Sequence, residues 1–227
     1  MASYTIPPGL EYLFQLDQVL IKQKIQVFEL LSGCDMKNKY ELRNSVDQPF
    51  GMAKEESSCI TRQCCGPSRS FDMEITDTNE MEIIHLHRPF KCGGSCCYVC
   101  KGCLQMIEVQ APPGTPIGSV HQEFSFCTPF ACKYTVRNQA GEIILRIEGP
   151  NCPCSCGSDV EFKVLSEDNS TLIGKITKQW RGCCTEALTD ADNFCVTFPL
   201  DLEIRYKAIL VGATFLIDFM FFEKRKR

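Results

Sequence analysis

The chain has 227 residues, of which 44% are hydrophobic and 23% charged, a balance typical of globular proteins rather than disordered ones. Its formal net charge of −4 gives no reason to expect nucleic acid as the main partner. The first ten residues, MASYTIPPGL, lack the cationic and apolar regions of a secretory signal, so we expect the thiols to be kept reduced in the cytosol.

Short strands are the main elements expected along the chain. After a short lead, residues 1–9, residues 10–16 have apolar positions at helical spacing and residues 20–28 alternate partly as a strand does. From residue 40 onward, alternating runs are separated by turn-forming clusters. These runs are YELRN, PFGMAKE, FDMEI, MEIIHLH, CLQMIEVQ, IGSVHQEFSF, CKYTVRN, IILRIEG, VEFKVL and TLIGKITKQW. Such a series of β-hairpins predicts a sandwich or closed barrel, and we expect one domain over residues 10–227.

The C-terminal segment Ala208–Phe222 is apolar except for one acid, Asp218. A membrane-spanning helix needs roughly 20 apolar residues, and an acid in the bilayer core costs on the order of 3 kcal/mol. These limits favour a helix that fills the barrel. The alternative is a short membrane anchor with the basic tail, residues 224–227, on an anionic leaflet. In either role the helix includes Ala208, Gly212, Phe215, Asp218 and Phe222.

Seventeen cysteines are many for a chain without an export signal. The odd number and adjacent pairs such as Cys64-Cys65 fit a disulfide framework poorly. The densest run, KCGGSCCYVCKGCLQ at residues 91–105, has CxxC spacings, and the CPCSC run at residues 152–156 could complete a zinc site. Irregular spacing disfavours zinc, whereas exposed thiols near a membrane are reasonable S-acylation acceptors.

No constellation of residues indicates catalysis. The chain contains no GxSxG, HExxH, P-loop or GxGxxG motif. His85 and His87 alternate on one strand face, but we expect no acidic neighbour on that face and therefore a structural role. The sequence predicts a protein that is not an enzyme.

Residues 190–201, DADNFCVTFPLD, place acids at the first, third and last of twelve positions. A calcium loop of EF-hand type needs oxygen ligands at alternate positions, glycine at position 6 and a bidentate glutamate at position 12. Here position 6 is Cys195 and position 12 is an aspartate. The segment predicts either a weak calcium site, near about 10⁻⁴–10⁻³ M, or an Asx-rich turn. The candidate ligands are Asp190, Asp192 and Asp201.

The segment GKITKQWRG, residues 174–182, combines three cations with the only tryptophan. It could be a basic patch for an import receptor or lipid headgroups, or an ordinary strand. Its candidate residues are Lys175, Lys178, Trp180 and Arg181.

Several segments together resemble the phospholipid scramblase family. They are PPGLEYLFQLDQVLI, NKYELRNS, CCGPSRSF, LQMIEVQAPPGTPIG, LTDADNFCVTFPLDLEI and GATFLIDFMFFE. They follow the family order and cover almost the whole chain. The resemblance implies a Tubby-like fold, in which a closed twelve-stranded antiparallel β-barrel surrounds a hydrophobic C-terminal helix.

The resemblance also implies an activity, sites and a location. The activity is Ca²⁺-responsive, ATP-independent, bidirectional movement of phospholipids between leaflets, with low-affinity Ca²⁺ at the acidic segment. The location is the plasma membrane, with a type II single-pass helix and most of the chain cytoplasmic, and the nucleus through GKITKQWRG when the chain is unacylated. The palmitoylated cysteines would be Cys96, Cys97, Cys100 and Cys103.

Three departures from the family pattern limit how many of these family properties we expect in this chain. The long Pro-rich region that recruits SH3 or WW partners is absent from this sequence, the cysteine run is broken up, and Cys195 replaces glycine in the acidic segment. A second hypothesis is therefore an acylated, membrane-tethered lipid-binding adaptor without translocation activity. Homo-oligomers in the membrane would fit the first hypothesis.

Overall fold

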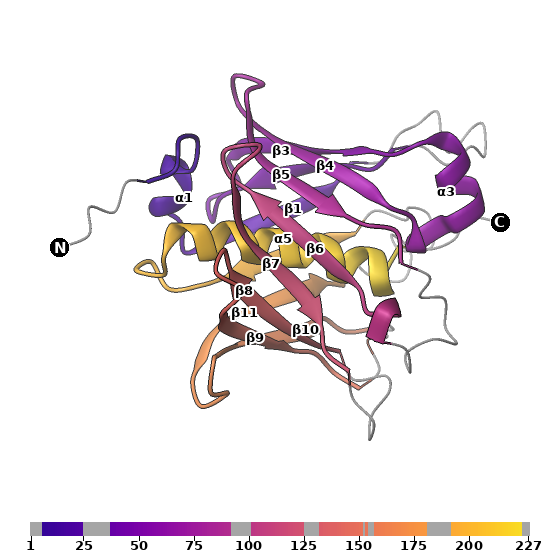
Figure 1. The fold of residues 1–227 in the computed structure, drawn as a ribbon. Coiled ribbons are helices and arrows are strands. Elements are labelled where there is room, and N and C mark those ends of the chain that lie inside the picture. The colour runs from indigo at the N-terminus through magenta and orange to yellow at the C-terminus, as the bar shows by residue number, and fades with distance from the viewer. Residues whose placement is uncertain are drawn as a thin grey trace.

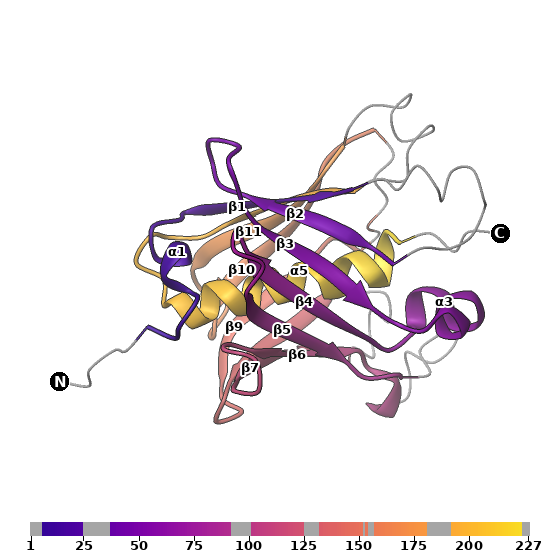
Figure 2. The same cartoon turned by 90° about the horizontal axis from the view of Figure 1, so that it is seen from above.

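The computed structural model describes residues 6–24, 37–91, 101–124, 132–151, 153, 157–180 and 192–223. Twelve antiparallel strands form a closed barrel, and one long helix, α5 (Ile204–Phe221), runs through it (Figures 1 and 2). The fold expected from the hairpin series and from the family resemblance is confirmed.

Alternating side chains explain the strands: in β1, for example, Val19 and Ile21 are fully buried while their neighbours are partly exposed. The strands are β1 (Gln18–Gln23), β2 (Lys39–Arg43), β3 (Pro49–Glu56), β4 (Phe71–Asp77), β5 (Glu82–Arg88), β6 (Met106–Gln110), β7 (Pro116–Gln122), β8 (Lys133–Asn138), β9 (Ile143–Glu148), β10 (Val160–Ser166), β11 (Leu172–Gln179) and β12 (Asn193–Thr197).

Each strand pairs with its neighbours in sequence, and β1 pairs with β12 to close the barrel. Val19 lies opposite Val196 in this closing pair, so both fill the interior. Closure gives each of the twelve described strands a partner on both sides, so the sheet has no edge strand at which edge-to-edge aggregation usually occurs.

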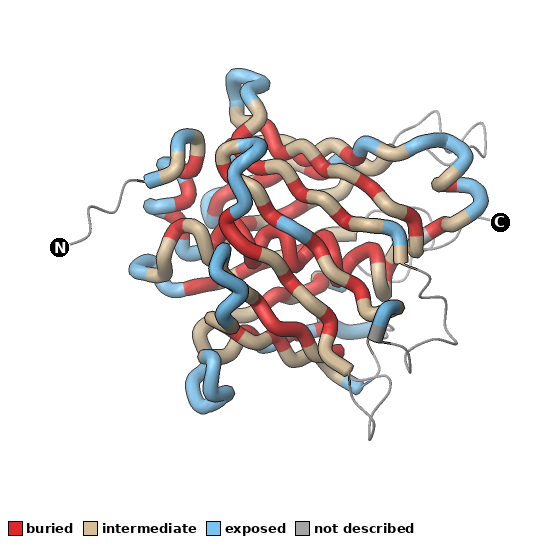
Figure 3. Tube along the Cα trace, in the orientation of Figure 1, coloured by how far each residue is buried: buried red, intermediate tan, exposed pale blue. Residues whose placement is uncertain are grey.

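Helix α5 is the core of the barrel. Every residue from Lys207 to Phe219 is buried, so the helix is enclosed on all sides, and its tube is mostly coloured as buried in Figure 3. A helix that is apolar on all faces is stable in water only when it is surrounded, and the barrel surrounds it. At Gly212, an added Cβ would lie 2.8 Å from Cγ2 of Val109, so strand β6 lies against the helix backbone.

The helix begins at Ile204, four residues before the expected start, and carbonyl groups around its first turns satisfy a buried cation. Lys207 is fully buried, and its Nζ donates to the carbonyl oxygens of Leu13, Leu16 and Leu200 at 3.2, 2.7 and 2.9 Å. Helix α1 (Glu11–Phe14) closes this end of the barrel. The barrel-core interpretation of the C-terminal segment is therefore correct. No helix in the described ranges is both long enough and apolar enough to cross a membrane.

The opposite end of the barrel carries helix α3 (Cys59–Cys65) and the short 3-10 helices η1 (Gly66–Ser68) and η2 (Lys101–Cys103) (Figure 1). Ser58 caps α3 by accepting a hydrogen bond from the Thr61 amide at 3.1 Å. The last turn of α5 also lies at this end.

Candidate functional site

A buried ion cluster holds the C-terminal end of α5. Arg69, after η1, is 0% exposed and donates from Nε and Nη2 to the two Glu55 carboxylate oxygens at 2.6 and 2.8 Å. Its Nη2 also donates to Glu223 Oε1 at 2.6 Å, and Asn38 donates to the same oxygen at 3.0 Å. Arg69 further stacks over the Phe219 ring at 4.7 Å. The cluster therefore ties the end of α5 to β3 and η1.

A second buried acid of α5 is hydrogen-bonded to the barrel wall. The Tyr40 hydroxyl donates to Asp218 Oδ2 at 2.7 Å. Burial raises the pKa of Asp218 well above its usual range, and the nearby Asp192 carboxylate adds to this effect while the Tyr40 hydrogen bond opposes it. A neutral Asp218 fits an apolar core.

The raised pKa of Asp218 gives stability a defined pH dependence. Because the folded protein holds the proton more tightly than the unfolded chain, this group stabilises the fold at low pH. That contribution is lost as pH rises from the unfolded pKa, about 3.9, toward the folded pKa. We expect the free energy of unfolding of wild type minus that of Asp218→Asn to fall with rising pH. Urea denaturation of both proteins from pH 4 to 8 measures this, and a flat difference would contradict it.

The acidic segment reaches the same end of α5 through Asp192. Lys178 of β11 is 5% exposed and pairs with Asp192 Oδ1 at 2.9 Å. The Asp192 amide donates to Gln23 Oε1 at 2.8 Å, so β1 fixes the backbone here. Lys178 Nζ also lies 4.7 Å from the centroid of the Phe222 ring, just after α5. The Lys178–Asp192 pair thus links this segment to the helix end.

The structure separates two of the three proposed calcium ligands, Asp192 and Asp201. Asp192 precedes β12 and Asp201 follows it, so a five-residue strand separates them. At a rise of about 3.3 Å per residue, one ion with ligands at about 2.3–2.6 Å cannot contact both carboxylates. The segment thus contains a strand and is not a compact loop, and the calcium site stays a prediction. Asp190 lies outside the described residues.

The segment GKITKQWRG does not form one basic surface. Lys175 points outward and pairs with Glu161 at 3.0 Å, whereas Lys178 points inward to its partner Asp192. Trp180 is 36% exposed and follows β11, and Arg181 lies outside the described residues. Strand alternation explains the separation, since residues 175 and 178 face opposite sides.

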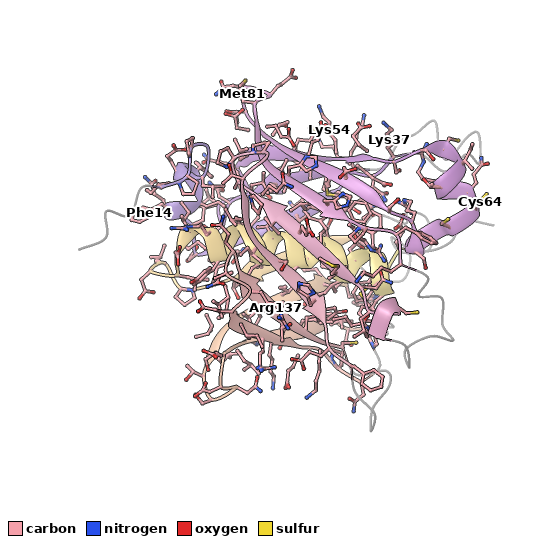
Figure 4. All side chains as sticks on the ribbon, viewed as in Figure 1. Phe14, Lys37, Lys54, Cys64, Met81 and Arg137 are labelled. Carbon is pink, nitrogen blue, oxygen red and sulfur yellow. The ribbon has the colours of Figure 1, made fainter. Side chains whose placement is uncertain are left out.

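Most of the proposed acylation sites, Cys96, Cys97 and Cys100, lie outside the described residues. Cys103 is partly exposed at the end of η2, and its carbonyl accepts a hydrogen bond from Gln105 at 3.1 Å. Sequence reasoning missed further exposed thiols, Cys59 and Cys64 of α3, at the same end of the barrel (Figure 4).

The expectation that the histidine pair has no acidic neighbour was wrong. His87 Nδ1 lies 2.7 Å from Asp72 Oδ1 across the β4–β5 pair, and His85 Nδ1 lies 2.7 Å from Glu82 Oε1. Asp72 belongs to the neighbouring strand β4, which alternation alone does not locate, whereas Glu82 lies at the start of β5 itself. The described part of the chain holds no group of three or more His, Cys, Asp or Glu side chains suited to a metal ion.

Comparison with known proteins places this chain in a family. The family model described as Scramblase matches residues 1–224. Human phospholipid scramblase 1 is 52% identical to this chain, and the match covers 96% of this chain and 66% of the relative. Bovine phospholipid scramblase 2 is also 52% identical, and the match covers 96% of this chain and 72% of the relative. Human phospholipid scramblase 2 is 46% identical over 97% of this chain and 72% of its own length. The chain thus spans about two thirds of the first of these relatives. No solved structure gives a significant match. The full-length family match shows that this chain belongs to the scramblase family.

Proposed function

We propose that this protein moves phospholipids in both directions between the leaflets of a membrane, without ATP and in response to Ca²⁺. The observation that carries the proposal is the alignment of nearly the whole chain with proteins named phospholipid scramblases. The absence of a recognised catalytic motif is consistent with a translocator that forms no covalent intermediate.

The position of α5 suggests how Ca²⁺ acts. A lipid headgroup needs a polar path or a thinned bilayer, and a helix enclosed in its own barrel offers neither. We infer that low-affinity Ca²⁺ binds at the Asp190–Asp192 end of the acidic segment and competes with Lys178 for the Asp192 carboxylate. Lys178, which is 5% exposed beside Phe222, would then lose its ion pair with Asp192. Loss of an ion pair from a buried charge is unfavourable, so the end of α5 would loosen.

A liposome dithionite assay tests the calcium step with a matched pair of variants. Asp192→Asn should remove the Ca²⁺ dependence, because the variant already lacks the carboxylate that pairs with Lys178 and should scramble without Ca²⁺ as wild type does with it. Asp201→Asn removes the same charge from the other end of β12 and should leave the Ca²⁺ response unchanged. Equal responses of wild type and Asp192→Asn would refute the calcium assignment, and no scrambling by wild type would refute the activity.

The burial of α5 also favours a second candidate, an acylated lipid-binding adaptor without translocation activity. In it, acyl chains on Cys96, Cys97, Cys100 and Cys103 would provide the membrane attachment, because α5 is occupied in the barrel. Carbonate extraction with and without hydroxylamine separates the two. Release of the protein after thioester cleavage supports attachment by acyl chains alone, and retention supports an inserted helix.

We also propose a location and partners for this protein. We place the protein at a phospholipid membrane, with the plasma membrane and a largely cytoplasmic chain as the specific proposal, and a homo-oligomer as the translocating form. Import into the nucleus when unacylated would depend on Lys175, Trp180 and Arg181 more than on Lys178, because Lys178 is buried.

A further inference from the structure

A cation-lined groove lies on the outer face of the barrel, away from the ion cluster around α5. It has a volume of about 420 Å³, within the range of small-molecule sites, and lies over β7, β8 and β9. Its lining includes Lys91, His121, Glu123, Thr135, Arg137 and Arg146.

Strand register brings these side chains together. His121 lies opposite Thr135 across β7 and β8, and Thr135 lies opposite Arg146 across β8 and β9. Arg137 is two residues from Thr135 on β8 and therefore faces the same side of the sheet. Thr135 is only 4% exposed although it faces outward, so the longer side chains around it form the walls of the groove and Thr135 its floor.

The charge balance of the groove favours an anion. Its acid, Glu123, is paired with Arg146, so Lys91 and Arg137 remain as the two cations without an ion pair among the described residues. Arg137 Nε is buried and has no hydrogen-bond partner in the described part of the chain. The guanidinium makes one long contact, from Nη1 to the Gly141 carbonyl at 3.5 Å. A planar guanidinium with unused donors matches the oxygens of a phosphate group.

The pKa of His121 depends on the positive charges in this groove. Burial lowers the pKa of His121, and the charges of Arg137 and Lys91 lower it further, while Glu108 on β6 opposes them. Its Nε2 is 2.9 Å from the Ser119 hydroxyl. A bound anion would offset the cations and raise this pKa.

We propose that this groove binds a phosphate group, carried by an anionic phospholipid headgroup or a soluble phosphate, through Arg137 and Lys91 beside His121. The inference concerns binding and stands whether or not the protein moves lipid across the bilayer.

Proton NMR of the full chain tests the site, because the protein has only three histidines and two of them, His85 and His87, serve as internal controls. The probes are dihexanoyl phosphatidic acid, inorganic phosphate and, as a zwitterionic control, dihexanoyl phosphatidylcholine. We expect phosphatidic acid to raise the pKa of His121 and to leave that of His85 unchanged. An equal effect of inorganic phosphate assigns the site to free phosphate, and an effect of phosphatidic acid alone assigns it to the lipid.

Two variants and a matched control make the test specific. Arg137→Gln and Lys91→Gln should each weaken phosphatidic acid binding about tenfold, as loss of a charge-assisted contact does. Without ligand, Arg137→Gln should already raise the pKa of His121. Lys54→Gln removes a positive charge from β3, which lies five strands around the barrel from Arg137 on β8 (Figure 4). It should bind phosphatidic acid as wild type does. The proposal is overturned if no phosphate probe shifts the His121 titration, or if Lys54→Gln weakens binding as much as Arg137→Gln.

Discussion

Replacing Arg69 with leucine is expected to lower the free energy of unfolding by about 3–5 kcal/mol, because it leaves buried carboxylates without their cation. Glu55 is 0% exposed and receives two hydrogen bonds from Arg69, and Glu223 receives a third. The interaction with Arg69 also lowers the pKa of Glu55 despite its burial, so this carboxylate is charged in the folded protein. Urea denaturation at pH 7 measures the effect.

Two further variants test whether this buried cluster contributes more to stability than an exposed ion pair does. Lys175→Gln breaks an ion pair whose side chains are 39% and 49% exposed, and it should cost less than about 1 kcal/mol. Arg69→Leu combined with Glu55→Leu should recover part of the lost stability, because one of the unpaired carboxylates is removed with the cation. If Arg69→Leu cost no more than Lys175→Gln, the buried cluster would not hold the end of α5 as described.

Gly212→Leu should also destabilise the protein, by about 1–3 kcal/mol or more, because there is no room for a side chain between α5 and the wall. A Cβ at this position would lie 2.8 Å from Val109 Cγ2 and 3.2 Å from Leu86 Cδ2. In a helix outside the barrel the same change would stabilise by up to about 1 kcal/mol, since leucine is a better helix former than glycine. The sign of the change in the free energy of unfolding therefore distinguishes a helix inside the barrel from a helix outside it.

Thermal and urea denaturation of Gly212→Leu compare it with a control on the same helix. Arg205→Ala changes a partly exposed side chain of the first turn and should stay within about 0.5 kcal/mol of wild type. A stabilised Gly212→Leu protein would show that α5 is not packed against β6.

The sequence was sufficient to predict the barrel because the evidence for it is local. Each hairpin has its own alternating runs and turn, and a chain of hairpins leaves few topologies. Asp77, for example, organises the turn before β5 by accepting hydrogen bonds from the amides of Asn79 and Met81 at 2.8 and 2.9 Å. The length and single acid of the C-terminal segment likewise favoured a barrel core.

The candidate sites depend on contacts between distant residues, which a single sequence does not reveal. Arg69 and Glu223 are 154 positions apart, and Lys207 contacts carbonyls from the other end of the chain. The acidic segment matched a calcium loop by spacing, yet its middle pairs with β1 and β11 and is extended. Arg137 and His121 belong to separate hairpins, so the groove between them has no local motif.

Disulfide trapping between Val109→Cys and Gly212→Cys tests most directly whether α5 is the core of the barrel. The close approach of an added Cβ at position 212 to Val109 puts two such thiols within reach of a bond. Mild oxidation of the double variant, followed by peptide mapping that identifies the linked cysteines, should show the 109–212 bond in the folded protein. It should be absent when oxidation is carried out in denaturant. If both thiols remain unlinked in the folded protein, α5 does not pack against β6 and is not the core of the barrel.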